Sequence, residues 1–302
     1  MQITEIKKIL QCDQSQLLDY IISEINKYKF KKVIATDEYL YAVGNIPILL
    51  VAHLDIVHKN PPVQIFYDAQ KKVMWSPTGV GGDDRCGVIA IIELLRKGYL
   101  PSVLFTTNEE VGCLGAISFC RKEKLNKVRF ALEIDRRGNN QAVFYDCANK
   151  SFQDYIINNF GFDLQYGTFT DVSKIGEAFN IAIVNVSAGY YNEHTCIEFI
   201  NLKNLALTIQ KVQAILEDKD KTYYDYQKKV YPVNYYGNWN NWYKKDNKKN
   251  DGKERLNTWR LIIEDWKDLD EEEWKEYYGF DKPKNKADVY KTFIELYQKE
   301  EK

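Results

Sequence analysis

The strongest constraint on the fold is a series of short runs rich in apolar residues, separated by amphipathic segments. These runs include ILLVA, SVLFTT, VRFALEI and IAIVNVS. They have the length and composition of interior strands in a parallel sheet, where both faces are covered. Segments between them, such as CGVIAIIELLRKG, have the apolar spacing of helices. We therefore predict an α/β fold, a three-layer α/β/α sandwich with a mostly parallel mixed central sheet.

Other elements follow from the same periodicities. Residues 14–28 have apolar positions at helical spacing, and a long helix is expected over residues 197–218. VQIFYD and VMWS are typical of a β-hairpin.

The composition changes near residue 218, where the chain becomes rich in aromatic and charged residues. We therefore predict a catalytic domain over residues 1–218 and an aromatic-rich, largely helical C-terminal extension over residues 219–302, with helices over 254–269, 270–280 and 286–302. The extension resembles nothing familiar, and it could either pack on the catalytic domain or cover its cleft.

Charge and cysteine usage exclude several classes of protein. Lys+Arg number 42 and Asp+Glu 43, so no global field favours nucleic acid or an anionic membrane. The segment MQITEIKKILQCDQ lacks the apolar core of a signal peptide, and no run is long enough to span a bilayer. The 6 cysteines are widely spaced without a CxxC pair. We therefore expect a reduced, cytoplasmic protein, in host cytoplasm if the gene is viral.

Polar residues that can bind metals follow the predicted strands or begin the helix between them. Any one of them could be a helix cap or a surface charge. Their coincidence at successive strand ends instead favours one shared site, because sites in such folds form at the carboxyl ends of strands. The residues are His53, Asp55, Asp83, Glu109, Glu110, Asp135 and His194.

The residue types in this set suit a two-metal hydrolytic centre. Two zinc ions need nitrogen and oxygen ligands from both sides, a bridging carboxylate and a shared water. A further carboxylate must stand beside that water as general base. Asp55 is placed to hold the second ring nitrogen of His53. Zinc is the expected metal, although cobalt and manganese also fit such ligands.

The motifs AHLD, GGDDRCG, NEEVG, EID and EHTCIE occur in that order. In this order they resemble the co-catalytic dizinc peptidases, over about residues 40–215. The resemblance implies that His53 and Asp135 bind one zinc, Glu110 and His194 the other, and Asp83 both.

The same resemblance implies that Glu109 is the general base and acid, that Asp55 orients His53, and that a cis peptide bond follows Asp83. Many relatives carry a lid or dimerisation domain inserted between these motifs. Here the intervals from His53 to Asp83 and from Asp135 to His194 are too short for one.

The function that we expect is metal-dependent hydrolysis of a peptide bond by an exopeptidase, either an aminopeptidase or a di/tripeptidase. An amidohydrolase acting on an N-acyl amino acid or another non-peptide amide is the alternative. A single-zinc acyl-transfer relative and an inactive binding protein on the same fold are further alternatives. Arg85, Arg136 and Arg137 stand beside ligand positions and could bind a substrate carboxylate, or they could be structural charges. The expected partner is a small peptide or amide, and a homo-oligomer is left open.

Overall fold

The computed structural model describes residues 2–125, 127–167, 169–229, 267, 270–278, 281–284 and 288–289. The chain divides into two compact units, Met1–Val230 and Tyr231–Lys302. The helix predicted over residues 270–280 is present as α10 (Glu271–Tyr278). The helices predicted over 254–269 and 286–302 lie almost entirely outside the described residues.

The helices of the first unit are α1 (Ile3–Gln11), α2 (Gln14–Ile25), α3 (Gly82–Arg96), α4 (Leu114–Lys122), α5 (Lys150–Phe160), α6 (Asp171–Phe179) and α7 (Leu202–Glu217). The strands of the large sheet are β1 (Lys32–Ala35), β2 (Tyr39–Val43), β3 (Ile46–His53), β6 (Pro101–Thr106), β7 (Ala131–Arg136), β8 (Gln141–Val143), β9 (Asp163–Gln165) and β10 (Ile183–Ser187). A small sheet contains β4 (Phe66–Asp68), β5 (Val73–Trp75), β11 (Tyr190–Tyr191) and β12 (Phe199–Asn201).

The large sheet has the order β1-β2-β6-β3-β7-β10-β8-β9. Its central strands β6, β3, β7 and β10 are parallel, while β2 and β8 pair antiparallel on either side. Leu50 of β3 lies between Val103 of β6 and Leu132 of β7, and all three side chains are buried. The apolar-rich runs are thus interior strands, and the predicted α/β class is confirmed.

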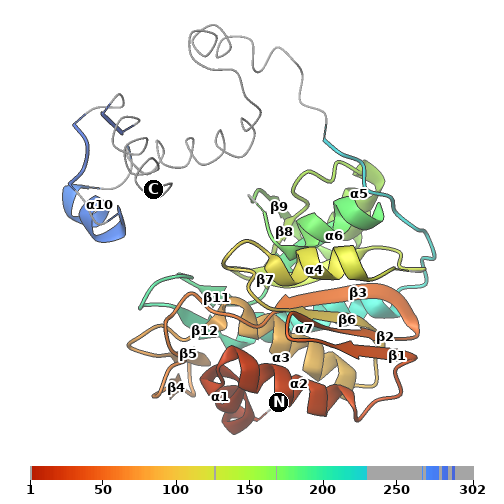
Figure 1. Cartoon of the computed structure of the whole chain (residues 1–302), viewed down its shortest axis with the longest axis horizontal. Helices are drawn as coiled ribbons and strands as arrows, with labels where there is room; N and C mark the ends of the chain where they lie inside the picture. The colour runs from red at the N-terminus through yellow and green to blue at the C-terminus, as the bar shows by residue number, and fades with distance from the viewer. Residues whose placement is uncertain are drawn as a thin grey trace, which may run out of the picture. The chain divides into compact units, whose positions relative to one another are not determined.

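Helices cover both faces of this sheet, as Figure 1 shows. Helices α1, α2, α3 and α7 lie on one side, and α4 and α6 lie on the other. Helix α2 begins with a capping box in which the Asp13 side chain accepts from Gln16 N–H and the Gln16 side chain accepts from Asp13 N–H. Among the described residues, none of the helices is both long enough and apolar enough to cross a membrane.

The small sheet, in the order β11-β12-β5-β4, was only partly predicted. The expected hairpin is present, with Tyr67 opposite Met74. The prediction of a helix from residue 197 was wrong at its start, because Phe199–Asn201 form strand β12 against β5. The helix begins only at Leu202, where the Asn201 side chain accepts backbone N–H bonds and caps it.

Among the described residues, the intervals between the sequence motifs contain no separate domain. Strands β4 and β5 join the small sheet, and the elements from β8 to β10 build on the large one.

Residues beyond helix α7 also belong to the first unit. Oδ2 of Asp220 lies 2.8 Å from Nη2 of the buried Arg129. The ring centroids of Tyr224 and Phe152 lie 5.1 Å apart. The first unit therefore continues past residue 218, where the composition changes.

Candidate metal centre

The parallel strands bring most of the candidate residues to one edge of the large sheet. His53 ends β3, Asp135 lies near the end of β7, and Glu109 and Glu110 lie in the turn after β6. Asp83 lies at the start of α3, which follows the small-sheet strand β5, and His194 follows β11. The seven candidate residues other than the arginines therefore converge from five separate parts of the chain.

The Asp83 carboxylate is the centre of this cluster, because each of its oxygens faces a different histidine. Oδ1 lies 3.2 Å from Nε2 of His53, and Oδ2 lies 3.1 Å from Nε2 of His194. On the first side, Oδ1 of Asp135 lies 3.6 Å from His53 Nε2. On the second side, Oε2 of Glu110 lies 3.2 Å from His194 Nε2. Two sets of donors thus share one carboxylate.

These separations fit metal ligation. With zinc–ligand bonds of about 2.0–2.1 Å, two ligand atoms of a tetrahedral site lie roughly 3.3 Å apart. Donor atoms of His53, Asp83 and Glu110 all lie within 4.8 Å of one another. Oε1 of Glu110 and Nδ1 of His53 are buried without a hydrogen-bond partner. The donor types and spacing therefore suit a cation between each histidine and Asp83.

The electrostatics of the cluster also favour cations. Burial raises the pKa of Asp135 to about 7, and the negative charge of Asp83 adds to this effect. Burial alone would lower the pKa of His53, but the carboxylates of Asp135, Asp55 and Asp83 raise it well above its usual value. Hydrogen bonds from His194 and His53 overcome burial and keep the pKa of Asp83 low. Crowded buried carboxylates repel one another, and divalent cations would remove that repulsion.

Asp55 makes two sets of contacts. Its Oδ1 lies 3.3 Å from Nδ1 of His53, although this pair is not aligned as a hydrogen bond. The same carboxylate accepts N–H bonds from Glu109 and Glu110, both at 3.0 Å. It therefore links His53 to the turn that presents both glutamates.

Glu109 is buried beside the cluster, set slightly back from the closest donor pairs. Its Oε2 lies 4.0 Å from Nε2 of His53, and the Cys113 thiol lies 3.7 Å from its Oε1 as a hydrogen-bond donor. Burial raises the pKa of Glu109 to about 7, with His53 opposing the rise and Asp135 adding to it. A carboxylate with this pKa can both accept and release a proton near neutral pH.

Asp135 is held by residues that the sequence did not single out. The Tyr190 hydroxyl donates to Oδ1 at 3.0 Å, and the Thr170 hydroxyl donates to Oδ2 at 3.3 Å. The buried Asn185 side chain accepts the Asp135 N–H and donates to its carbonyl oxygen. The pairing of β10 with β7 shifts register between Asn185 and Ser187, and this irregularity has no sequence signal.

The three arginines differ in where they lie. Arg85 is buried, and its guanidinium donates from Nη1 to the carbonyl oxygens of Ile9 and Leu10 at the end of α1. For Arg85 these bonds favour the structural role that the sequence left open, because the guanidinium secures α1. Arg136 donates to the Gln141 side chain at 3.0 Å. The Arg137 side chain is 54% exposed and pairs with Glu193 at 3.0 Å. Glu193 directly precedes His194 in the sequence.

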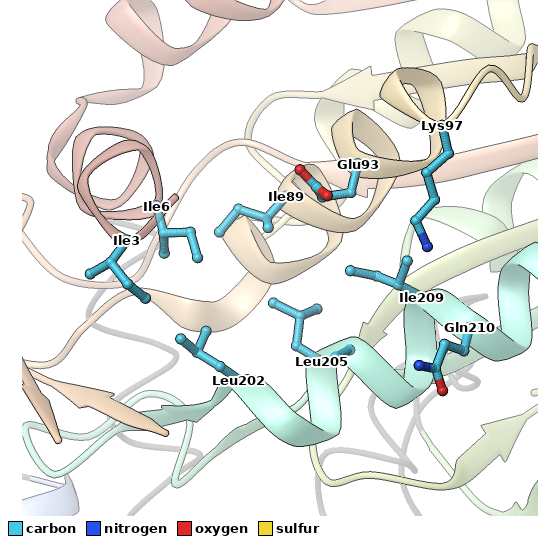
Figure 2. A pocket seen from close by; sticks show the side chains of 10 residues that line it. Ile3, Ile6, Ile89, Glu93, Lys97, Leu202, Leu205, Ile209 and Gln210 are labelled. Atoms are coloured by element: carbon cyan, nitrogen blue, oxygen red, sulfur yellow. The ribbon is translucent and has the colours of Figure 1, made fainter. Parts of the chain in front are cut away.

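A pocket lies apart from the cluster. It has a volume of about 240 Å³ and lies between α1, α3 and α7, as Figure 2 shows. Ile6, Leu205 and Ile209 give it an apolar wall, while Glu93 and Lys97 stand at its edge. None of its lining residues belongs to the candidate metal centre.

The fold and the cluster together have the form of a co-catalytic metallohydrolase. In agreement, the model of peptidase family M28 matches residues 41–160. This range includes every candidate position from His53 to Asp135, and His194 lies beyond it. The match confirms the resemblance to co-catalytic zinc metallopeptidases. It also supports the prediction that the chain is an enzyme, namely a zinc peptidase. No curated protein matches the chain.

Solved structures resemble this chain in fold at low sequence identity. The aminopeptidase PepT from Bacillus cereus is 13% identical with a TM-score of 0.59, covering 71% of this chain and 97% of that one. A tripeptidase from Staphylococcus aureus is 13% identical with a TM-score of 0.57, covering 70% and 96%. The TET1 peptidase from Pyrococcus horikoshii, which can assemble into a tetrahedron or a large octahedral shell, is 16% identical with a TM-score of 0.53, covering 71% and 98%. These likenesses establish the fold.

Proposed function

We propose that this protein is a zinc-dependent exopeptidase, an aminopeptidase or a di/tripeptidase, that uses two metal ions. The observation that carries the proposal is the Asp83 carboxylate, whose two oxygens lie 3.2 Å from His53 and 3.1 Å from His194. One ion would be held by His53, Asp83 and Asp135, and the other by Asp83, Glu110 and His194. The match to a peptidase family over residues 41–160 supports peptide hydrolysis.

The residues of the chain have separate roles in the proposed reaction. When bound, the ions would acidify a water and polarise the substrate carbonyl. Glu109 accepts the proton of the attacking water and then delivers it to the leaving amine. Its buried position, with a pKa of about 7, suits both transfers. Asp55 orients His53 and, through the N–H groups of Glu109 and Glu110, keeps the base beside the metal ligands.

Substrate recognition would involve the rim of the cluster. Arg137 is exposed and paired with Glu193, so each could exchange its partner for one charged end of a short peptide. Arg136 also follows Asp135, and its guanidinium is partly engaged by Gln141. A carboxylate bound here would equally suit an N-acyl amino acid, so the amidohydrolase alternative shares this recognition.

Hydrolysis of a matched set of peptides tests the proposal. The set contains a free peptide, its N-terminally blocked, C-terminally blocked and N-acylated forms, each with and without chelator. We expect chelator-sensitive cleavage that requires a free N-terminus. A requirement for an acyl group would instead establish the amidohydrolase. No cleavage and no bound metal, even with added zinc, cobalt or manganese, would establish an inactive binding protein.

We also propose that the catalytic domain lies within the first compact unit, since every candidate residue lies there. All cysteines are free, which supports a reduced compartment such as the cytoplasm. Homo-oligomer formation remains a proposal that a mass measurement in solution tests.

A further inference from the structure

We propose that Glu198 is a positioning residue that couples the bridging carboxylate of Asp83 to the loop bearing His194. This inference rests on the proposed two-metal function. Glu198 touches neither histidine of the cluster in the contacts described above. It acts through backbone N–H groups and thereby determines how tightly the chain binds metal.

The contacts of Glu198 carry the inference. Its side chain is 1% exposed. Oε2 accepts the Gly81 N–H at 2.7 Å, and Oε1 accepts the Asp83 N–H at 3.1 Å. Nε2 of His58 lies 3.2 Å from Oε2. One buried carboxylate thus holds both sides of the turn that presents Asp83, and it also accounts for the remaining histidine of the chain.

The small sheet fixes Glu198 at this place. Glu198 directly precedes β12, whose Phe199 pairs with Trp75 at the end of β5. Strand β5 leads into the turn that ends at Asp83, while β12 follows the loop that contains His194. The two segments therefore leave the same sheet side by side, and the Glu198 carboxylate joins them.

The turn and the loop are both closely packed. A Cβ at Gly82 would lie 2.8 Å from Ile200 Cγ1 and 2.9 Å from Tyr190 Cβ, so the turn rests directly on β11 and β12. On the loop side, the Thr195 hydroxyl donates to Asn192 O at 2.7 Å, and Glu198 N–H donates to Thr195 O at 3.2 Å. A shift of the Glu198 side chain would consequently move Asp83 relative to His194.

Substitution by glutamine separates this role from side-chain volume. The amide has one oxygen and one NH₂ group, so it cannot accept the N–H bonds of both Gly81 and Asp83. One donor would then face another donor in a buried place, which is unfavourable. Because E198Q also removes a charge, Glu198→Asp is needed beside it. Aspartate keeps the charge but shortens the reach by about 1.5 Å.

The control is Glu24→Gln. Glu24 is another buried carboxylate, 3% exposed, and it binds Arg96 at 2.9 Å away from the metal centre. E24Q therefore makes the same chemical change as E198Q at another buried carboxylate. Any general effect of destabilisation on metal binding would appear in both variants.

The experiment measures zinc per chain against buffered free zinc, together with amide hydrogen exchange of the metal-free proteins over residues 79–83 and 192–198. We expect E198Q and E198D to need about 10- to 100-fold more free zinc than wild type, as for other groups that orient metal ligands. Exchange in both segments should accelerate in these variants, and E24Q should match wild type in both readouts. If E198Q does not fold, His58→Gln, which removes only one contact, should show a smaller loss in the same direction.

Wild-type zinc affinity in E198Q, or an equal loss in E24Q, would overturn the inference. Wild-type affinity in E198D alone would also overturn it, because charge rather than position would then be responsible. Failure of the proposed two-metal function would give a different result, because the wild-type protein itself would then bind no zinc. That result would overturn the inference as well.

Discussion

Replacing Glu109 by glutamine should abolish hydrolysis while leaving metal binding intact. Oε2 of Glu109 lies 4.0 Å from His53 Nε2, whereas the proposed ligand pairs lie 3.1 to 3.6 Å apart. Glutamine has the same shape and still offers an oxygen to the Cys113 thiol. The variant loses only the ability to take and return a proton. General-base catalysis contributes about 10²- to 10⁴-fold, so kcat should fall by that factor, or about 3–5 kcal/mol in barrier.

The assay compares kcat and metal content for E109Q and for Glu110→Gln. Glu110 Oε2 lies 3.2 Å from His194 Nε2, so its replacement should reduce metal content as well as kcat. Neighbouring glutamates would thus give opposite results for metal binding. A drop of less than tenfold in kcat for E109Q, or a loss of metal equal to that of E110Q, would refute the separation of base from ligand.

Three other predictions concern stability. Arg96 lowers the pKa of Glu5 from 4.5 to about 2, so this pair stabilises the fold above pH 4.5 and its contribution is lost as pH falls toward 2. The Arg96→Gln variant should have a lower melting temperature than wild type at neutral pH. Its melting temperature should also fall less than that of wild type between pH 4.5 and pH 2. An equal dependence on acid pH in both proteins would contradict this. Removing metal by chelation should lower the unfolding free energy by about 4 kcal/mol for each bound ion, relative to zinc at 1,000 times its Kd, and calorimetry without any shift would argue against binding to the folded state. A chain ending at residue 218 should melt below one ending at residue 229, because it loses the buried Tyr224 and the Asp220 partner of Arg129; equal melting temperatures would show that this segment adds no stability.

Much of the fold could be predicted because its central strands are buried on both faces. ILLVA is wholly apolar and VRFALEI is rich in apolar residues, as expected of buried strands, and they pair directly as β3 and β7. The start of α7 was misplaced because Phe199 and Ile200 also fit a helical spacing. Only the pairing with β5, distant in the sequence, makes them a strand.

The candidate site could be predicted as far as residue types and strand ends allow. His53, Asp83 and His194 stood out because few residue types can bind a metal ion. Asn185, Tyr190 and Glu198 did not, since their contacts with backbone atoms of Asp135 or Asp83 depend on a register shift and on the small sheet. The sequence could not decide the role of Arg85, because it stands next to a cluster position in the sequence while its guanidinium donates to the end of α1.

The central claim is that two metal ions share the Asp83 carboxylate. Anomalous diffraction at the zinc edge, from crystals of the full chain grown with zinc, tests it most directly. The account predicts two peaks about 3.5–4 Å apart, one beside His53 and Asp135 and the other beside Glu110 and His194. A single peak that leaves one histidine without metal, or no peak near Asp83, would contradict it.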